Sequence, residues 1–204
     1  MVAHMLLGPA VPLLFQGEEF AASSPFLYFA DHQGELGQQV KKGRQKFLAQ
    51  FPTMATPQMQ GRLADPGDPQ TFRRCVLDHS ERESNRTMVA LYRDLLALRR
   101  DDAAFDGTSR LEAATLGEDA WVLRYIAEGS DRLVIVNLGH DLVFETIPEP
   151  LLAPVEGRGW RLLWSSETPE YGGAGIPEPV ADGVWHIPGQ ATIVLAPGDR
   201  AASD

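Results

Sequence analysis

Two adjacent acidic residues, Glu18 and Glu19, follow a short apolar run, Pro12–Phe15, and could supply acid–base chemistry. Two carboxyl groups that act on one bond as acid and nucleophile must lie on either side of that bond. Neighbouring side chains of a strand point to opposite faces, so Glu18 and Glu19 cannot flank the same bond. We therefore expect these residues to support the wall of a pocket, by hydrogen bonds or charge, and we predict no catalysis by them.

Two Asp-His dipeptides are the next candidates for chemistry. Asp31-His32 and Asp78-His79 could each form a hydrogen-bonded dyad of the kind that activates a nucleophile. No serine or cysteine has a placed partner in the sequence, however. A nucleophilic triad is therefore not predicted.

The single cysteine, Cys75, stands beside Arg74, a neighbour that can favour a reactive thiolate. A half-buried structural cysteine is the favoured interpretation. One cysteine cannot form an internal disulfide, which suits a reducing compartment, and we predict a cytoplasmic location. The five histidines and the cysteine show no zinc-ligand spacing, so we expect no metal.

Charge and length exclude several classes of partner. The 204 residues include 18 basic and 28 acidic ones, for a formal charge of -10, which disfavours nucleic acid. Neutral sugars remain possible ligands. The apolar stretch 5–15 is too short to span a bilayer and contains Gly8, Pro9 and Pro12, so no membrane partner is expected. With 44% apolar residues, the chain can form a packed core.

Residues 1–104 show helical patterns and one strand-like run. Pro12–Phe15 is wholly apolar and is closed by Gly17, as in a strand buried on both faces of a parallel sheet. Residues 35–51 predict an amphipathic helix with a basic outer side. A solvated face is the favoured interpretation of that basic side, with anion binding as the alternative. The apolar side carries Leu36, Val40, Phe47 and Leu48, and the basic side carries Lys41, Lys42, Arg44 and Lys46.

The clearest helix is predicted over residues 85–100, where apolar side chains recur at the helical period from Met88 to Leu98. Ser80 and Glu83 have the spacing of a capping box, slightly ahead of this helix. Arg99 and Arg100 fall in its last turn, where they complement the helix dipole. A turn is predicted over residues 65–69, which are rich in Pro, Gly and Asp.

From about residue 109 onward the pattern changes to period two. Trp121, Leu123 and Tyr125 share one face of a strand, and Leu133 and Ile135 share a face of the next. Gly129-Ser130, Gly139 and a glycine-rich loop at 172–175 punctuate the pattern. We predict an antiparallel sandwich of about six to eight strands. The further strand-like runs are 142–147, 160–164, 183–187 and 191–195.

The apolar run Pro12–Phe15 predicts an incomplete sheet. A buried parallel strand needs neighbours on both edges and helices on both faces, and nothing else in residues 1–104 supplies them. Full burial of Leu13, Leu14 or Phe15 is worth roughly 1.5–3 kcal/mol each, most of which is lost without the rest of the sheet. We expect residues 1–104 to be the remnant of a larger domain whose upstream part is missing, and residues 105–204 to form a complete β domain.

Several blocks of the sequence resemble one family. Residues 8–20 resemble the eighth and last barrel strand of the α-amylase superfamily. Residues 24–32, Ser-Pro-Phe-Leu-Tyr-Phe-Ala-Asp-His, resemble the malto-oligosyltrehalose trehalohydrolase subgroup, whose members carry Pro-Phe-Leu-Tyr-Phe-x-Asp-His there. The resemblance covers nearly the whole chain and is strongest over residues 8–32 and 68–100. Further blocks are Leu91–Arg100, Trp164–Glu167 and Tyr171–Gly175.

This resemblance implies a (β/α)₈ barrel enzyme with a carboxy-terminal β sandwich. The family cleaves the α-1,4 bond beside a terminal trehalosyl unit and releases trehalose. A full barrel takes roughly 250 residues, so the chain is expected to be an α+β fragment that holds the last strand and closing helices of the barrel. The expected partners are a maltooligosaccharide-type substrate and the missing amino-terminal part. No organic cofactor is implied.

The resemblance also places the catalytic carboxylates outside this chain. Glycoside hydrolysis needs at least two carboxyl groups, and the family's three acids lie at the ends of barrel strands upstream of the eighth. We therefore expect no catalytic residue here and an inactive isolated chain. Gly139-His140-Asp141 and Arg93-Asp94 imitate family motifs, but a hairpin turn and a helix-surface charge, respectively, explain them.

Substrate contact is predicted for Phe26, Tyr28, Asp31 and His32, which follow the segment that resembles the eighth strand. Aromatic rings stack on sugar rings, and a carboxylate or imidazole can hydrogen-bond hydroxyl groups. Loops at this end of a barrel line the catalytic mouth. The alternative is that Phe26 and Phe29 simply pin the loop to the barrel.

Two further hypotheses for the whole chain remain open. One is a stand-alone carbohydrate-binding or interaction protein built on the β sandwich. The other is a fragment of a different α-amylase-superfamily enzyme, such as a glucan-branching or debranching enzyme. The segment Phe26–Phe29 favours the trehalohydrolase subgroup over this last hypothesis.

Overall fold

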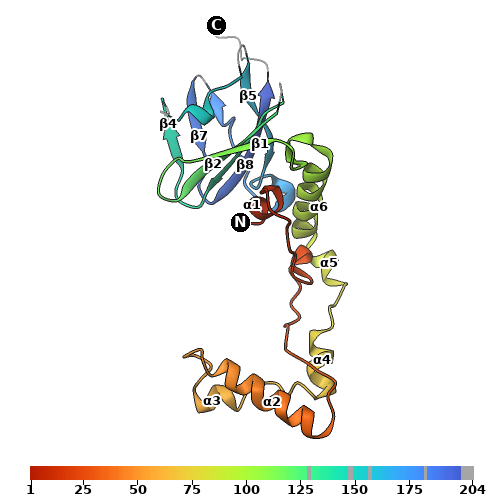
Figure 1. Ribbon diagram of the computed structural model, residues 1–204. Helices are drawn as coiled ribbons and strands as arrows, with labels where there is room; N and C mark the ends of the chain where they lie inside the picture. Colours follow the sequence, from red (N-terminus) through yellow and green to blue (C-terminus); the bar gives the residue numbers. More distant parts are fainter. Residues whose placement is uncertain (128–129, 147–148, 156–157, 182, 199–204) are drawn as a thin grey trace. The chain divides into compact units, whose positions relative to one another are not determined.

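A computed structural model describes residues 1–127, 130–146, 149–155, 158–181 and 183–198 (Figure 1). By contacts, the chain divides into two compact units. One joins Met1–Glu19 to Asn85–Asp204, and the other is Phe20–Ser84. The domain boundary predicted near residue 104 remains a prediction. The contacts place residues 1–19 and 85–104 in the same unit as the β domain. No helix of the described part of the chain is long and apolar enough to cross a membrane.

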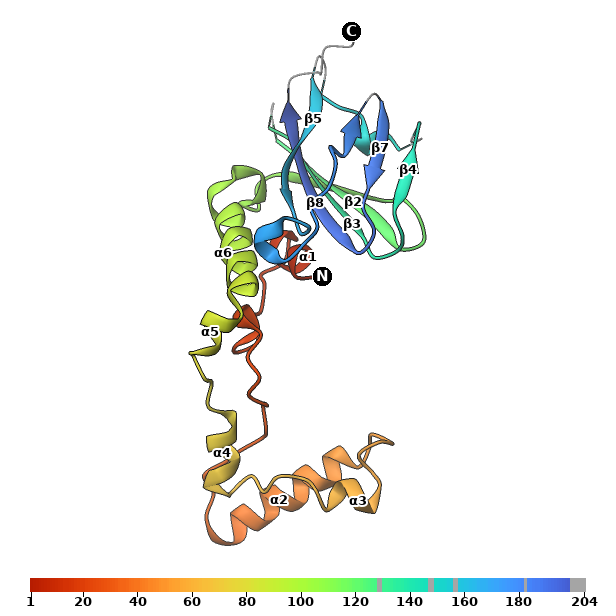
Figure 2. The ribbon, with the colours of Figure 1, turned by 180° about the vertical axis from the view of Figure 1, so that it is seen from behind.

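The β domain is an antiparallel sandwich, as predicted (Figures 1 and 2). Its larger sheet has the order β1-β2-β3-β8-β5, and its smaller sheet has the order β4-β7-β6. The strands of the larger sheet are β1 (Arg110–Thr115), β2 (Ala120–Ile126), β3 (Arg132–Asn137), β8 (Ala191–Gly198) and β5 (Gly159–Ser165). Those of the smaller sheet are β4 (Leu142–Phe144), β7 (Val184–Ile187) and β6 (Val180–Ala181). Gly129 and Ile147, within predicted turn and strand segments, lie outside the described residues.

Alternation along the strands builds two apolar layers on the larger sheet. Leu133 and Ile135 face the smaller sheet, where they pack with Ile187. Leu123 and Tyr125 face the other way, toward the helices. The faces predicted for β2 and β3 are therefore confirmed. β8 lies between β3 and β5 and is buried along its whole length.

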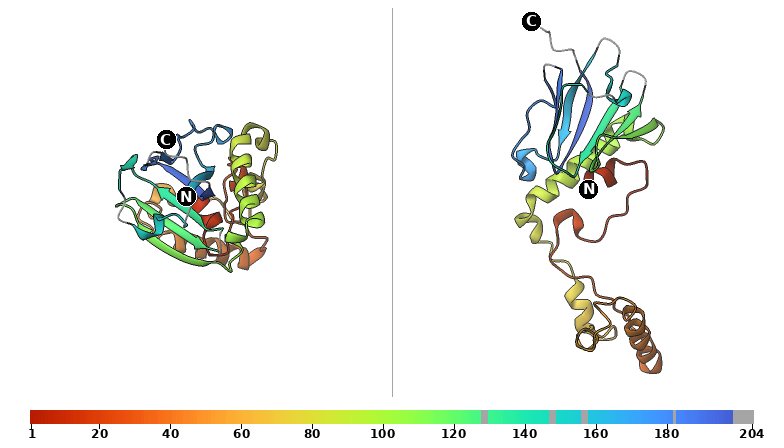
Figure 3. Two further views of the ribbon diagram at one scale, coloured as in Figure 1. Left: turned by 90° about the horizontal axis from the view of Figure 1, so that it is seen from above. Right: turned by 90° about the vertical axis from the view of Figure 1, so that its left-hand side faces the viewer.

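Two helices, α1 (Val2–Leu7) and α6 (Arg86–Asp101), cover the outer face of the larger sheet (Figure 3). Leu6, Leu7 and Leu95 are fully or almost fully buried there. A short 3₁₀ turn, η2 (Ala103–Phe105), follows α6 and places the Phe105 ring 4.9 Å from that of Tyr125. Two more 3₁₀ turns, η3 (Pro150–Leu152) and η4 (Pro169–Tyr171), lie within the β domain.

The helix predicted over residues 85–100 is confirmed, but its ends are held differently from the prediction. Asn85 occupies the N-cap position of α6, while the Ser80 hydroxyl donates to the Asp78 carboxylate at 2.7 Å, so the predicted capping box does not start this helix. At the other end, Arg99 donates to the carbonyl oxygens of Gly8 at 2.9 Å and Ala10 at 3.1 Å. Arg99 also donates to Leu6, and therefore fastens the end of α1 to α6.

The apolar run Pro12–Phe15 forms no strand in the described part of the chain, so the prediction of a buried strand is wrong here. Val11 and Leu13 are 92% and 88% exposed, and Phe15 is 53% exposed. Leu14, between them, packs against the α1–α6 core, so alternate residues still point in opposite directions. Burial of both faces requires neighbouring strands, and the described residues do not provide them.

The regular elements that the structure describes in the Phe20–Ser84 unit are helices. Its elements, with the 3₁₀ turn that leads into it, are η1 (Glu18–Phe20), α2 (Gly34–Leu48), α3 (Pro57–Gln60), α4 (Pro69–Cys75) and α5 (Glu81–Ser84). The predicted helix over residues 35–51 is confirmed as α2, but none of its residues is buried. The predicted turn before α4 is also confirmed, since the Gly67 amide donates to the Asp65 carboxylate at 3.1 Å. Asp68 then caps α4 by accepting from the Gln70 amide at 2.8 Å.

Polar bonds tie the two ends of this unit together. The Ser23 amide donates to the Glu81 carboxylate at 2.9 Å, and the Ser24 hydroxyl donates to the Val76 carbonyl at 2.9 Å. Cys75 is buried, and its sulfur accepts from the Leu27 amide at 3.1 Å. The structural interpretation of this cysteine is therefore supported by its contacts.

Candidate functional site

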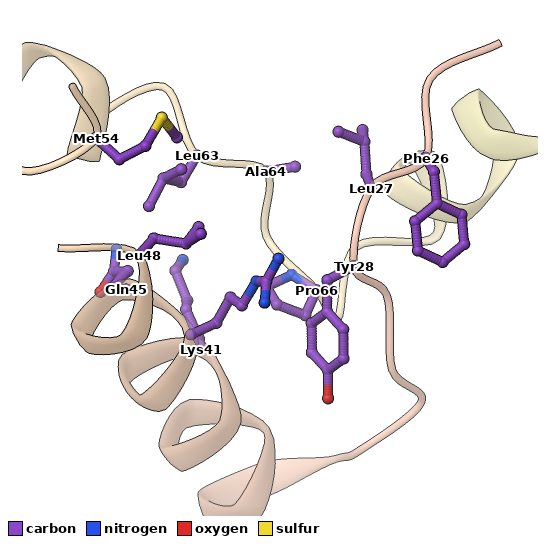
Figure 4. A pocket seen from close by; sticks show the side chains of 11 residues that line it. Phe26, Leu27, Tyr28, Lys41, Gln45, Leu48, Met54, Leu63, Ala64 and Pro66 are labelled. Atoms are coloured by element: carbon purple, nitrogen blue, oxygen red, sulfur yellow. The ribbon is translucent and has the colours of Figure 1, made fainter. Parts of the chain in front are cut away.

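A half-open pocket of about 210 Å³ lies within the Phe20–Ser84 unit (Figure 4). One wall is the loop that carries the predicted contact residues, a second is α2, and the third is formed by the connections before and after α3. These walls contribute Phe26, Leu27 and Tyr28; Lys41, Arg44, Gln45 and Leu48; and Met54, Leu63, Ala64 and Pro66.

The loop wall presents aromatic rings to solvent. Phe26 is 56% exposed and Tyr28 is 43% exposed, so both rings can accept a stacked ligand. Phe29 packs edge-on to Phe72 with ring centres 5.1 Å apart. Both interpretations of this loop therefore have support: Phe29 pins it, while Phe26 and Tyr28 line the pocket.

The wall formed by α2 is basic, which corrects the predicted orientation of this helix. Lys41 and Arg44 belong to the side that is predicted to face solvent, but both line the pocket. Lys41 donates to the Asp65 carboxylate at 2.7 Å, and this bond, aided by the Gly67 amide, lowers the pKa of Asp65. Hydrophobic spacing showed that one side of the helix is apolar, but it could not show which side meets the loop.

The other two predicted contact residues are placed elsewhere. Asp31 and His32 are exposed and are not among the residues that line the pocket. Asp31 accepts a hydrogen bond from the Gln33 side chain at 3.0 Å. The His32 backbone lies against the start of α2, where any side chain at Gly37 would collide with its carbonyl oxygen. The structure therefore brings Phe26 and Tyr28 to one pocket and leaves Asp31 and His32 outside it.

Glu18 has a structural partner on α6. Its carboxylate accepts from the Phe15 amide at 2.9 Å and from the Tyr92 hydroxyl at 2.9 Å. Burial raises the pKa of Tyr92 to about 12, and the hydrogen bond to Glu18 and the charges of Glu18 and Glu19 act in the same direction. These contacts anchor the chain after Pro12–Phe15 to α6, and the predicted support of a pocket wall by Glu18 and Glu19 stays a prediction.

The two segments that imitate family motifs, Arg93-Asp94 and Gly139–Asp141, have structural explanations. Asp94 accepts from Arg93 at 2.8 Å and from the Tyr171 hydroxyl at 2.8 Å, so it joins α6 to the β domain through η4. The sequence predicts only a surface position on the helix for Asp94, because nothing in the sequence pairs it with Tyr171.

The segment Gly139–Asp141 is a turn, but the prediction of a hairpin is wrong. It connects β3 of the larger sheet to β4 of the smaller one, and these strands do not pair. Asn137 organises the turn: its side chain donates to the His140 carbonyl at 2.7 Å and accepts from the Gly139 amide at 2.9 Å.

A second, more open hollow lies beside α6 and includes three carboxylates. Each is already ion-paired: Asp94 with Arg93 at 2.8 Å, Asp101 with Arg100 at 2.7 Å, and Asp102 with Arg132 at 2.7 Å. Within the part of the chain that the structure describes, no group of three or more His, Cys, Asp and Glu residues is arranged to hold a metal ion. Neither the pocket nor this hollow therefore presents two unpaired carboxylates to a ligand.

Comparison with known proteins gives consistent relationships. The family described as a domain of unknown function (DUF3459) matches residues 108–194, which span most of the β domain. A malto-oligosyltrehalose trehalohydrolase from Deinococcus radiodurans is 43% identical over 168 residues, covering 76% of this chain and 27% of that protein. One from Mycobacterium tuberculosis is 34% identical over 170 residues, covering 80% of this chain and 26% of that protein.

The fold also matches solved structures. The crystal structure of an alpha amylase candidate from Salmonella typhimurium has 24% sequence identity and a TM-score of 0.65, and the match covers 96% of this chain and 30% of that one. The predicted fold class, an α+β fragment that ends in an all-β sandwich, is therefore confirmed. The chain spans about a quarter of the length of the curated relatives described above.

Proposed function

We propose that this chain forms the carboxy-terminal part of a glycoside hydrolase, because it is a relative of the malto-oligosyltrehalose trehalohydrolases of the α-amylase superfamily. The reaction would be cleavage of the α-1,4-glucosidic bond next to the trehalosyl end of maltooligosyltrehalose, with release of trehalose. The observation that carries this proposal is the 43% identity to the relative from Deinococcus radiodurans over 76% of the chain. The same relationship favours this reaction over those of glucan-branching and debranching enzymes.

Within such an enzyme, the chain would complete a barrel that an amino-terminal part begins. The match covers only 27% of the Deinococcus radiodurans relative, which leaves ample length for the remaining barrel. The exposure of Val11, Leu13 and Phe15 supports this role, because alternate apolar side chains in solvent are what an unpaired strand presents. Partner strands would bury these residues and satisfy their backbone groups.

The isolated chain is proposed to be inactive for a chemical reason. Hydrolysis of a glycosidic bond needs two carboxyl groups about 5–5.5 Å apart for retention, or roughly 6.5–9.5 Å apart for inversion. No Asp or Glu lines the pocket on α2. Glu18, the carboxylate nearest to the apolar run in sequence, already accepts hydrogen bonds from Phe15 and Tyr92.

The chain's own contribution to the substrate would be binding. Phe26 and Tyr28 offer exposed rings on which a glucosyl unit can stack, and Asp31 and His32 have exposed side chains that can hydrogen-bond hydroxyl groups. Polarisation of the glycosidic oxygen and nucleophilic attack would come from the amino-terminal part. We also propose a cytoplasmic location, as the single cysteine suggests.

A two-part assay tests the proposal. The purified chain is incubated with maltooligosyltrehalose, alone and with the amino-terminal remainder of the Deinococcus radiodurans relative, and released trehalose is quantified. We expect release only from the mixture. Release by the chain alone would contradict the absence of catalytic acids. Binding of maltooligosaccharides without turnover in either arm would favour a stand-alone carbohydrate-binding protein.

A further inference from the structure

The charges of α2 differ from those of the rest of the molecule. The chain carries a formal charge of -10, yet α2 has a single acidic residue, Glu35, at its start. Its basic residues are Lys41, Lys42, Arg44 and Lys46. A local concentration of positive charge on an acidic protein attracts anions to that place.

Only part of this basic set belongs to the pocket. The pocket-lining residues of α2 are Lys41, Arg44, Gln45 and Leu48, which follow one another at the spacing of a single helix face. Lys42 and Lys46 do not line the pocket. The helix therefore contains two cations that face the pocket and two of the same charge that do not, which provides matched controls.

Arg44 is held in place without an acidic partner. Its guanidinium carbon lies 5.2 Å from the centre of the Tyr28 ring and 5.4 Å from that of the Phe47 ring. Cation–π contacts of this kind orient the planar group without using its N–H donors. No carboxylate pairs with Arg44 within the described ranges, whereas Lys41 is paired with Asp65 at 2.7 Å. The Arg44 fork can thus receive an anion in a bidentate manner.

The hydrogen-bonding groups of the lining select the kind of ligand. Arg44 and Lys41 can only donate, and the lining side chains that can accept, Gln45 and Tyr28, are neutral. A phosphate monoester presents acceptor oxygens and negative charge, and therefore suits this lining better than a neutral sugar does. The exposed ring of Tyr28 adds an apolar surface for a small ring. Pockets for drug-sized ligands have volumes of about 300 Å³ or more. This pocket, at about 210 Å³, therefore suits a smaller ligand.

We propose that this pocket binds a monosaccharide phosphate, with Arg44 and Lys41 at the phosphate and Tyr28 against the sugar ring. The site goes beyond the hydrolytic role proposed above and does not depend on it, because every lining residue belongs to Phe20–Ser84.

The test is a titration of the full chain, followed by NMR amide shifts and by calorimetry, with glucose 6-phosphate, inorganic phosphate and glucose. We expect glucose 6-phosphate to bind most tightly, inorganic phosphate more weakly, and glucose least. Arg44→Gln should weaken glucose 6-phosphate binding by about tenfold, which corresponds to about 1.4 kcal/mol. Lys46→Gln, which removes the same charge from the same helix, should weaken it less than twofold.

A second variant separates the phosphate from the ring. Tyr28→Leu should reduce the preference for glucose 6-phosphate over inorganic phosphate while leaving phosphate binding nearly unchanged. Equal losses of glucose 6-phosphate affinity in Arg44→Gln and Lys46→Gln would mean a general effect of positive charge and would contradict the proposed site. Glucose binding as tightly as its phosphate would overturn the ligand class. An unchanged preference in Tyr28→Leu would overturn the ring contact, and the amide spectrum of each variant shows whether it is folded.

Discussion

The β sandwich and the Phe20–Ser84 unit bury their apolar side chains to very different extents. In the sandwich, β8 is buried along its whole length, and Val194 and Leu195 have no exposed surface. In the other unit, α2 has no buried residue, and Leu36 and Phe47 are each 53% exposed. Both segments have the apolar spacing of their element. Spacing therefore specifies a helix or a strand, whereas a core also needs a second apolar surface to pack against.

The two regions are consequently stabilised by different interactions. The sandwich depends on area removed from water between its layers, which is the dominant favourable term in folding. The Phe20–Ser84 unit depends on a few polar ties, such as those of Ser23 to Glu81 and Leu27 to Cys75. All four tryptophans, at positions 121, 160, 164 and 185, lie in the sandwich. Tryptophan fluorescence therefore reports on one region alone.

The largest expected effect comes from the sandwich core. Leu195→Ala should lower the free energy of unfolding by about 2–5 kcal/mol, because it leaves a cavity beside Leu133 and Leu162. The measurement is urea unfolding followed both by tryptophan fluorescence, which reports on the sandwich, and by far-ultraviolet circular dichroism, which also reports on α2. The matched control is Leu36→Ala, which removes the same atoms from an exposed position of α2. It should change the free energy of unfolding by less than about 0.5 kcal/mol. Similar losses in both variants would contradict the contrast between the regions.

A smaller effect is expected at the link between the sandwich and the apolar run. Arg99→Ala should destabilise the sandwich unit by about 2 kcal/mol, since the carbonyls of Leu6, Gly8 and Ala10 lose their charged donor. Arg100→Ala is the control, because its pair with Asp101 is largely exposed and is worth at most about 1 kcal/mol. Thermal unfolding of both variants checks the difference, and equal melting temperatures would show that the Arg99 bonds carry no net stability.

The smallest effect concerns pH. The hydrogen bond from Arg93, followed by that from Tyr171, lowers the pKa of Asp94 below its ordinary value of 3.8, against burial, which raises it. A lowered carboxyl pKa stabilises the fold above the unfolded value, and this contribution is lost as the pH falls through the folded pKa. Asp94→Asn should therefore cost less than about 1 kcal/mol at pH 7, and the difference should vanish in strong acid. A pH-independent difference would show that the charge is not the cause.

The sequence was most informative where local pattern decides the structure. Alternation placed Leu123 and Leu133 on their observed faces, and the helical period located α6. β1 was not singled out because Arg110–Thr115 has little apolar alternation, and β6 is only two residues long. The run Pro12–Phe15 has the composition of a buried strand, but burial depends on strands that the described residues do not contain.

Prediction of the candidate site was limited in the same way. The aromatic character of Phe26 and Tyr28 pointed to ligand contact, and the structure places both at one pocket. Their neighbours Asp31 and His32 lie outside it, in the segment just before α2 begins at Gly34. The contribution of Arg44 depends on which side of α2 meets the loop, and that is a tertiary property that hydrophobic spacing does not encode.

Hydrogen exchange tests the central claim most directly. The chain is mixed with the amino-terminal remainder of the Deinococcus radiodurans relative, and amide exchange is followed by mass spectrometry. Completion of a barrel predicts new protection at residues 11–15 and in α2, with β8 unchanged because it is already buried. Unchanged exchange at residues 11–15 in a mixture that forms a stable complex would contradict the assignment of this run as an unpaired barrel strand.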